Sequence, residues 1–135
     1  MFRQENNIVV AKFVEGEIIE NLKNLMKEID GRSALIINGV GQLESVTIGY
    51  FDGNEYIKKK LDDVFELVSL QGNIGMSGNN YIVHAHVSLG NRNHEIIGGH
   101  LIEGKVKTVN EISLLILKEI EIRREKKGNL MEMFI

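Results

Sequence analysis

Three of the four histidines in the chain, His84, His86 and His100, fall at spacings that could form one metal site. The segment YIVHAHVSL at 81–89 alternates apolar and polar residues, which predicts a strand with one apolar face. Residues two positions apart on a strand point to the same side, so we expect His84 and His86 to share its polar face. The third imidazole of such a site must come from His100.

A polar segment separates this strand from the third histidine. Its sequence, GNRNHE at 90–95, contains one glycine and two asparagines, which is typical of a turn. His94 lies in this turn, and we expect it to be an ordinary surface residue. The apolar residues at 96–102 then predict a returning strand, so that the two strands form a β-hairpin.

The register of this hairpin decides where the third histidine points. If the turn leaves an odd number of residues unpaired, His100 lies across from His84 or His86 on the same face. An even number sends it through the sheet to the apolar side. We expect the odd register, because Gly98 and Gly99 leave room for imidazoles or a bound group to approach the backbone.

Zinc is the natural occupant of a site with three histidines. Neutral imidazoles bind borderline-soft divalent ions, and three protein ligands leave a fourth position for water or another ligand. For the HAH pair alone, solvated or hydrogen-bonded side chains are the commoner interpretation. A third histidine on the same face favours a zinc site at His84, His86 and His100.

Glu66 is the carboxylate that could act beside these histidines. It lies in VFELVSL at 64–70, a predicted strand, and we expect it to be partly buried and in need of a partner. The apolar residues on its side of the strand are Val64, Val68 and Leu70. Glu66 could complete a metal site, orient a histidine from behind, or pair with a lysine or arginine, and structural pairing is the favoured interpretation.

The composition limits the classes of protein to which the chain could belong. Its 135 residues fit one domain, 1–135, with a sizeable core, and 43% hydrophobic residues are ordinary for a globular protein. The absence of cysteine excludes disulfides and thiolate metal sites. No apolar run approaches the ~20 residues that span a membrane, and the first ten residues lack a signal-peptide layout. We therefore expect a cytoplasmic protein that does not bind membranes.

The charge balance bears on nucleic-acid binding. There are 16 Lys and Arg against 19 Asp and Glu, a formal net charge of −3. A protein that binds nucleic acid mainly through phosphates usually has a basic surplus, so we do not expect DNA binding by a diffuse basic surface. The clearest local cluster, Lys58 to Lys60, lies on a predicted edge strand, where lysines equally prevent sheets from pairing.

The remaining segments predict a single α+β domain, with a mostly antiparallel sheet of about seven strands packed with one or two helices. Apolar spacing predicts an amphipathic helix over 17–29, ended by Asp30 and Gly31. Strands are expected at 8–14, 33–37, 44–51, 56–60 and 64–70, and turns or loops at 38–43, 52–54 and 71–80.

The C-terminal part is less clearly patterned. The segment 105–124 favours a strand through its β-branched residues, although its leucines leave a helix open. RREKKG at 123–128 predicts a basic turn, and 130–135 predicts an apolar, strand-like tail. Such a tail must be covered by the core or by a neighbouring subunit.

Four segments together resemble the PPC domain (plants and prokaryotes conserved domain) along nearly the full length of the chain. They are NGVGQLESVTIGYFD at 38–52, ELVSLQGNIG at 66–75, HAHVSLGN at 84–91 and GGHLIEGKVKTVNEI at 98–112. Taken in this order they are far more specific than any one alone. The resemblance implies a central, largely antiparallel sheet packed with a helix, and assembly as a homotrimer.

The resemblance also bears on function. Plant members of this family carry the domain behind AT-hook motifs, which bind the minor groove of A·T-rich DNA, whereas prokaryotic members consist of the domain alone and are described as candidate DNA-binding proteins. This chain has no Arg-Gly-Arg-Pro core and no proline, so the DNA-contacting residues of plant members have no counterpart. His84, His86 and His100 match positions where prokaryotic members carry histidines, which are candidates for a metal.

Two functions of different classes follow. In the first, the chain is a homotrimeric regulatory module that associates with DNA or DNA-bound partners and uses zinc as a structural or ligand-sensing element. In the second, a zinc-dependent enzyme or sensor acts on a small molecule, with Glu66 as the attractive general base for hydrolysis. No serine–histidine–acid or paired-carboxylate arrangement is present, and we favour the first, non-enzymatic function.

Overall fold

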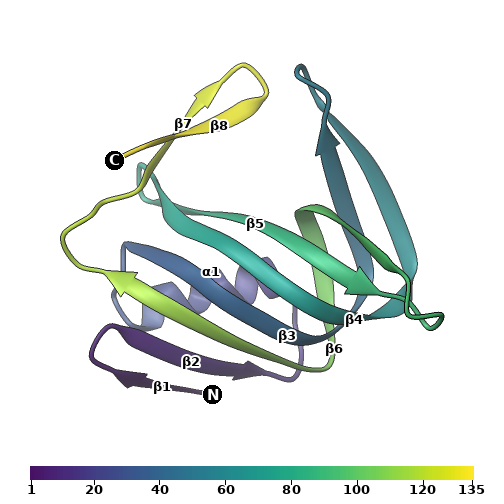
Figure 1. Ribbon diagram of the computed structural model, residues 1–135. Helices are drawn as coiled ribbons and strands as arrows, with labels where there is room; N and C mark the ends of the chain where they lie inside the picture. The colour runs from purple at the N-terminus through teal and green to yellow at the C-terminus, as the bar shows by residue number, and fades with distance from the viewer.

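The computed structural model describes residues 1–135 and contains one eight-stranded sheet and one helix (Figure 1). The elements are β1 Phe2–Glu5, β2 Ile8–Phe13, α1 Ile18–Glu28, β3 Ser33–Phe51, β4 Tyr56–Ser77, β5 Asn80–Gly90, β6 Ile96–Leu117, β7 Arg123–Lys127 and β8 Leu130–Phe134. All pairs are antiparallel except β4 with β7, which makes the sheet mixed. The predicted α+β class is confirmed, with eight strands rather than about seven.

Four of the strands close on themselves. β3 pairs with β4 and β6, and β5 pairs with the same two strands. β6 can take part in this ring because it is 22 residues long. Its first residues lie against β5, and its later residues lie against β2. The histidines of β5 and β6 therefore belong to one continuous sheet.

α1 supplies one side of the core. Its buried residues follow helical spacing and are Ile18, Leu22, Leu25 and Met26. The side chain of Glu17 accepts a hydrogen bond from the N–H of Glu20 at 2.9 Å, which caps the first turn. The helix expected at 17–29 is confirmed within one residue at each end. No helix of the structure has the length and apolar character of a membrane-spanning segment.

The turn expected at 38–43 and most of the loop expected at 71–80 are wrong. β3 continues through the first segment, and β4 continues to Ser77, so that each forms one long strand. The expected tight turn at 52–54 is confirmed, because Phe51 pairs with Tyr56 across it. Glycine and asparagine are typical of turns, but in β3 and β4 these residues lie inside the strands.

Two of these glycines allow neighbouring strands to approach closely. A Cβ atom at Gly41 would collide with the carbonyl oxygen of Val109, and one at Gly72 would collide with the carbonyl oxygen of His84. Glycine inside a strand marks such close backbone contacts as well as turns. Composition alone does not separate the two roles, which explains the wrong expectation.

The ends of the chain also differ from expectation. β1 was not predicted, whereas the strand expected at 8–14 is confirmed as β2. β6 joins the strand expected at 96–102 to the first part of 105–124, and no helix forms there. The basic turn expected at 123–128 is wrong, because β7 occupies most of it and pairs with β8. The strand-like tail is confirmed as β8.

The face of the sheet turned away from α1 carries both histidines of β5. One row of directly paired residues crosses this face from β2 to β5 and consists of Ile8, Leu115, Leu35, Asn73 and His84. Two hairpins, β3–β4 and β7–β8, project from the sheet on either side of β5 (Figure 1). Their turns are joined by a hydrogen bond from Asn129 Nδ2 to Asn54 O at 2.9 Å.

Candidate metal centre

The β5–β6 hairpin places His100 directly opposite His86. Gly90 pairs with Ile96, so residues 91–95, an odd number, are unpaired. The predicted odd register is therefore confirmed, and His100 lies on the same face as His86.

The two glycines beside His100 do not open space for imidazoles. A Cβ atom at Gly98 would collide with the carbonyl oxygen of Val87, and one at Gly99 would lie 2.9 Å from the carbonyl oxygen of Gly49. The glycines thus let neighbouring strands approach closely. The expectation that they leave room for imidazoles or a bound group is therefore wrong. His94, in the turn, is exposed at the surface as expected.

The three imidazoles converge. One nitrogen from each of His84, His86 and His100 lies within 4.8 Å of the other two. The ring centroids are 5.2 to 5.5 Å apart. A tetrahedral zinc ion with Zn–N distances of about 2.0–2.1 Å places its ligand nitrogens roughly 3.4 Å apart. The observed limit of 4.8 Å is larger, so the three side chains must draw together when a zinc ion binds.

The surroundings keep two of the rings neutral. Burial, reinforced by the Arg124 guanidinium and by the rings of His100 and His86, lowers the pKa of His84 from 6.5 to about 4. Burial, and then the nearby His86, also lowers the pKa of His100. Neutral imidazole is the form that binds a metal ion, so little proton displacement is needed at neutral pH.

His100 shows how well these residues fit a metal. Its ring stacks on Tyr56, with centroids 4.6 Å apart and planes inclined by 28°. Its Nδ1 atom is buried and has no hydrogen-bond partner. A buried polar atom without a partner is uncommon, because it loses its hydration without compensation. A ring that is held in place and incompletely bonded suits a ligand group, and the donor set of three imidazoles suits a divalent ion such as zinc.

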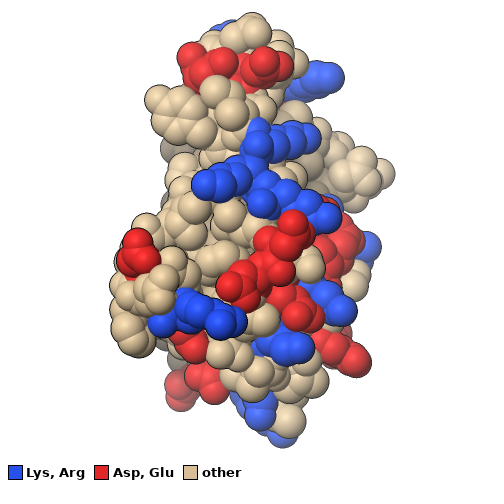
Figure 2. All heavy atoms as spheres, turned by 90° about the vertical axis from the view of Figure 1, so that its right-hand side faces the viewer, with Lys and Arg blue, Asp and Glu red and all other residues tan.

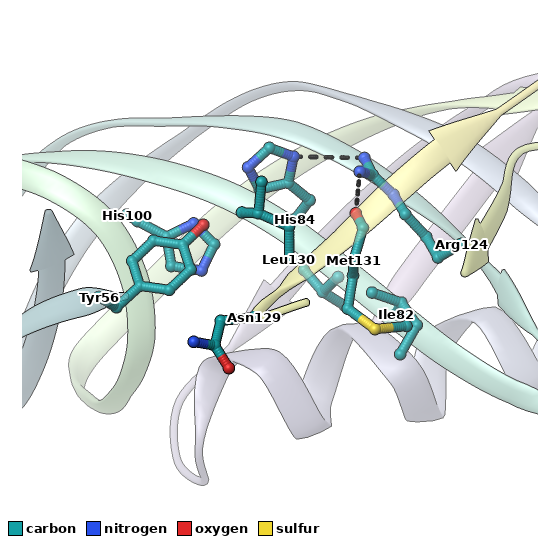
Figure 3. Close-up of a pocket in the computed structure, with 9 residues that line it drawn as sticks. Tyr56, Ile82, His84, His100, Arg124, Asn129, Leu130 and Met131 are labelled. Atoms are coloured by element: carbon teal, nitrogen blue, oxygen red, sulfur yellow. Dashed lines mark hydrogen bonds between the residues drawn. The ribbon is translucent and has the colours of Figure 1, made fainter. Parts of the chain in front are cut away.

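Arg124 contacts one of the three histidines, and the sequence pattern did not reveal it. Its Nη2 lies 3.2 Å from His84 Nδ1, and its Nη1 donates to Met131 O at 3.0 Å (Figure 3). Nη2 also donates to Asn73 Oδ1 at 2.6 Å. We expected a basic turn here. The one available signal was that Arg124 shares a strand side with Ile122, an apolar residue that is buried.

A cavity of about 230 Å³ lies beside His84 and His100 (Figure 3). The β7–β8 hairpin forms one side of it, and an adjoining cavity of about 550 Å³ shares His84 and Arg124. The residues that line the smaller cavity are Tyr56, Ile82, Val83, His84, His100, Arg124, Asn129, Leu130 and Met131. His86 is more exposed and does not line either cavity. Two of the three histidines thus face a space that a small molecule could fill.

The structure does not bring Glu66 to the histidines. Glu66 pairs with Gly90, whereas the β4 residues opposite His84 and His86 are Asn73 and Gln71. Its side chain is exposed, so the expected burial is wrong. The carboxylate accepts a hydrogen bond from Gln42 Nε2 at 2.8 Å.

An irregularity in β4 explains part of this error. The register with β5 shifts between Leu67 and Ser69, so that Leu70 is buried while Glu66, Val64 and Val68 face outward. A bulge of this kind exchanges the two faces of a strand, and alternation alone does not show it.

Comparison with known families and structures gives three results. The family model of the Plants and Prokaryotes Conserved (PCC) domain matches residues 2–119. The chain is similar to the crystal structure of a plant- and prokaryote-conserved (PPC) protein from Pyrococcus horikoshii, with 36% identity and a TM-score of 0.87, over 100% of this chain and 94% of that one. No curated protein matches the chain.

Two further solved structures have names that bear on function. A metal-containing protein from Archaeoglobus fulgidus is 26% identical, with a TM-score of 0.85, over 100% of this chain and 99% of that one. A candidate DNA-binding protein from Bacteroides thetaiotaomicron is 22% identical, with a TM-score of 0.89, over 99% of this chain and 96% of that one. At that lower identity, the likeness shows the fold alone.

Proposed function

The chain belongs to the Plants and Prokaryotes Conserved domain family, and from this premise we propose that it is a zinc-binding regulatory module that senses a small ligand. Its metal ligands are His84, His86 and His100. The observation that carries the proposal is the convergence of one nitrogen from each ring within 4.8 Å, beside a cavity. The metal-containing protein from Archaeoglobus fulgidus supports it.

Zinc is favoured over other metals by the donor set. Three imidazoles without thiolate or carboxylate suit zinc, which would retain one open coordination position for water or a ligand and act there as a Lewis acid. The protein's own groups prepare this position. Burial keeps His84 neutral, Tyr56 stacks on the ring of His100, and the β7–β8 hairpin forms one side of the adjacent cavity.

Zinc-dependent hydrolysis of a small molecule is the alternative. The predicted general base, Glu66, lies away from the histidines and is bonded to Gln42. The residues that line the cavity beside His84 and His100 include no carboxylate. Glu132 lines only the adjoining, larger cavity and pairs with Lys127 at 3.2 Å. These observations favour ligand sensing over hydrolysis, because a water bound in the smaller cavity would meet no carboxylate to accept its proton.

We propose a homotrimer as the assembly. The face of the sheet away from α1 exposes apolar side chains of neighbouring strands, including Ile8 (46% exposed), Val10 (54%) and Leu35 (40%). Apolar side chains gathered on one face are typical of an interface. The molar mass by light scattering tests this: three times 15.2 kDa is expected, and a monomer at all concentrations contradicts it.

The association with DNA remains a prediction from the family resemblance. Two similar structures are named as candidate DNA-binding proteins, but they are only 22% and 17% identical to this chain. On the side that carries the β3–β4 hairpin, one group of basic side chains lies in the upper half of the view, and acidic side chains adjoin it directly below (Figure 2). The basic group is therefore small and bordered by negative charge. Retention of a random duplex that falls steeply with salt would support direct binding, and no retention at low salt would contradict it.

The metal content of protein purified without a histidine tag tests the zinc proposal. We expect about one zinc per chain, and at least about 100-fold weaker binding in His84→Ala and His100→Ala variants, because each loses a ligand. His94→Ala is the matched control, since His94 is an exposed histidine of the turn. Equal zinc affinity in all four proteins would rule out this site.

A further inference from the structure

We propose that the cavity beside the histidines binds a small organic anion, whose carboxylate or phosphate head lies near Arg124 and whose apolar body lies against Leu130 and Met131. This inference rests on the zinc site proposed above and names the class of ligand that the site senses. It follows from four features: an unpaired buried cation, its contact with His84, the absence of acidic groups, and the apolar lining.

Arg124 is a buried cation without a counter-charge. Only 6% of the residue is exposed. None of the ion pairs in the structure includes it, so no carboxylate oxygen lies within 4.0 Å of its guanidinium. A buried charge without a partner is strongly unfavourable, and the usual remedy is an ion of opposite sign. Burial lowers the pKa of Arg124, opposed only by the nearby Tyr56. The guanidinium nevertheless stays protonated at neutral pH.

The contact between Arg124 and His84 couples the cavity to the metal ligands. In the metal-free protein, Arg124 Nη2 lies 3.2 Å from His84 Nδ1, which must be the acceptor because arginine can only donate. A neutral imidazole has one lone pair. If Nδ1 binds the metal, that lone pair is taken. If Nε2 binds it, Nδ1 carries the proton. In either case Nδ1 no longer accepts from Arg124, and a guanidinium N–H is released.

The charge and shape of the cavity also favour an organic anion. A divalent ion beside Arg124 brings further positive charge to the smaller cavity, which no carboxylate lines, so an anion is the complementary ligand. Glu132 lines only the adjoining cavity, where Lys127 pairs with it at 3.2 Å. The rest of the lining is largely apolar, with Tyr56, Ile82, Leu130 and Met131 around a volume of about 230 Å³ (Figure 3). This lining favours a ligand with an apolar body over a bare inorganic ion.

Calorimetric titration tests the proposal with benzoate, phenyl phosphate and the neutral isostere benzamide, each added to zinc-loaded and to chelator-treated protein. We expect at least one of the two anions to bind the zinc-loaded protein, and benzamide to bind at least about tenfold more weakly, since a charge-assisted hydrogen bond is lost. The stronger anion identifies the head group. By linkage, the same anion must increase zinc affinity by the factor by which zinc increases anion affinity.

Arg124→Gln should weaken anion binding by roughly tenfold or more, since it removes the charge but keeps an amide donor. Arg123→Gln is the matched control, because Arg123 is exposed on the adjacent position of β7. The Gln variant could also loosen the β7–β8 hairpin, since Arg124 bonds Met131 O. The linkage measurement on the unmutated protein is independent of that effect.

Two results would overturn the inference while leaving the zinc site intact. One is stoichiometric zinc binding with no binding of either anion. The other is equal binding of benzamide and the anions. Failure of the zinc site itself would appear separately, as equal zinc affinity in the unmutated protein and the His84→Ala variant.

Discussion

His86 and His100 face each other directly across the β5–β6 ladder, with their ring centroids 5.5 Å apart. His84 lies two residues before His86 on the same strand face, and its ring centroid is 5.2 Å from that of His100. Three residues from two strands thus form a triangle without help from a loop. A site on paired strands is held by the backbone ladder, which favours a precise arrangement of ligands.

The stability of the metal-free protein should fall with acidification. The pKa of His84 is about 4 in the folded protein and 6.5 as its ordinary value, so between these values the unfolded chain binds more protons than the folded chain. The free energy of unfolding therefore decreases as the pH falls from 6.5 to about 4, and this loss is complete below about 4.

Denaturant titration of chelator-treated protein at a series of pH values measures this slope. His84→Asn should reduce the dependence of the free energy of unfolding on pH only in part. His100, whose pKa is lowered in the same direction, still contributes. His94→Asn should leave it unchanged. An unmutated protein whose stability is constant over this range would contradict the assigned burial of His84.

Gly72→Ala should destabilise the protein and weaken zinc binding together. The added Cβ would collide with the carbonyl oxygen of His84, and backbone cannot move aside as a flexible side chain can. We expect a loss of about 1–3 kcal/mol, as for other overpacked positions.

Gly90→Ala is the control for this prediction, because a Cβ there would meet Val68 Cγ2 at an ordinary 3.4 Å. Chemical denaturation and zinc competition should be measured on both variants. If both lose the same stability and keep the same zinc affinity, close strand approach at Gly72 does not position His84.

Glu66→Ala should leave zinc affinity within about twofold of the unmutated value, since surface changes away from a site have small effects. Its carboxylate bonds Gln42, and its strand partner is Gly90 rather than a histidine. A large loss of zinc affinity, measured by competition with a chromophoric chelator, would show that Glu66 reaches the metal after all.

The sequence was sufficient to predict that the three histidines converge, because their geometry is local. The spacing of His84 and His86 and the odd turn before His100 depend on neighbouring residues only. Arg124 could not be found in this way, since its contact with His84 arises when β7 pairs in parallel with the end of β4 and the Arg124 side chain reaches β5. That contact joins residues 40 positions apart.

The wrong expectations about the glycines and about Glu66 also have specific structural causes. Gly41 and Gly72 lie inside strands, where glycine serves close approach and not a turn. Glu66 precedes the register shift between Leu67 and Ser69, so its relation to Leu70 could not be taken from alternation. Both features depend on which strands become neighbours in the folded sheet. The sequence of a single segment does not determine those neighbours.

The most direct test of the account is anomalous diffraction at the zinc absorption edge from crystals of the tag-free protein grown with zinc. We expect one strong peak per chain, bonded to a nitrogen of each of His84, His86 and His100. An empty triangle in zinc-containing crystals, or a peak bonded only to the surface residue His94, would contradict it.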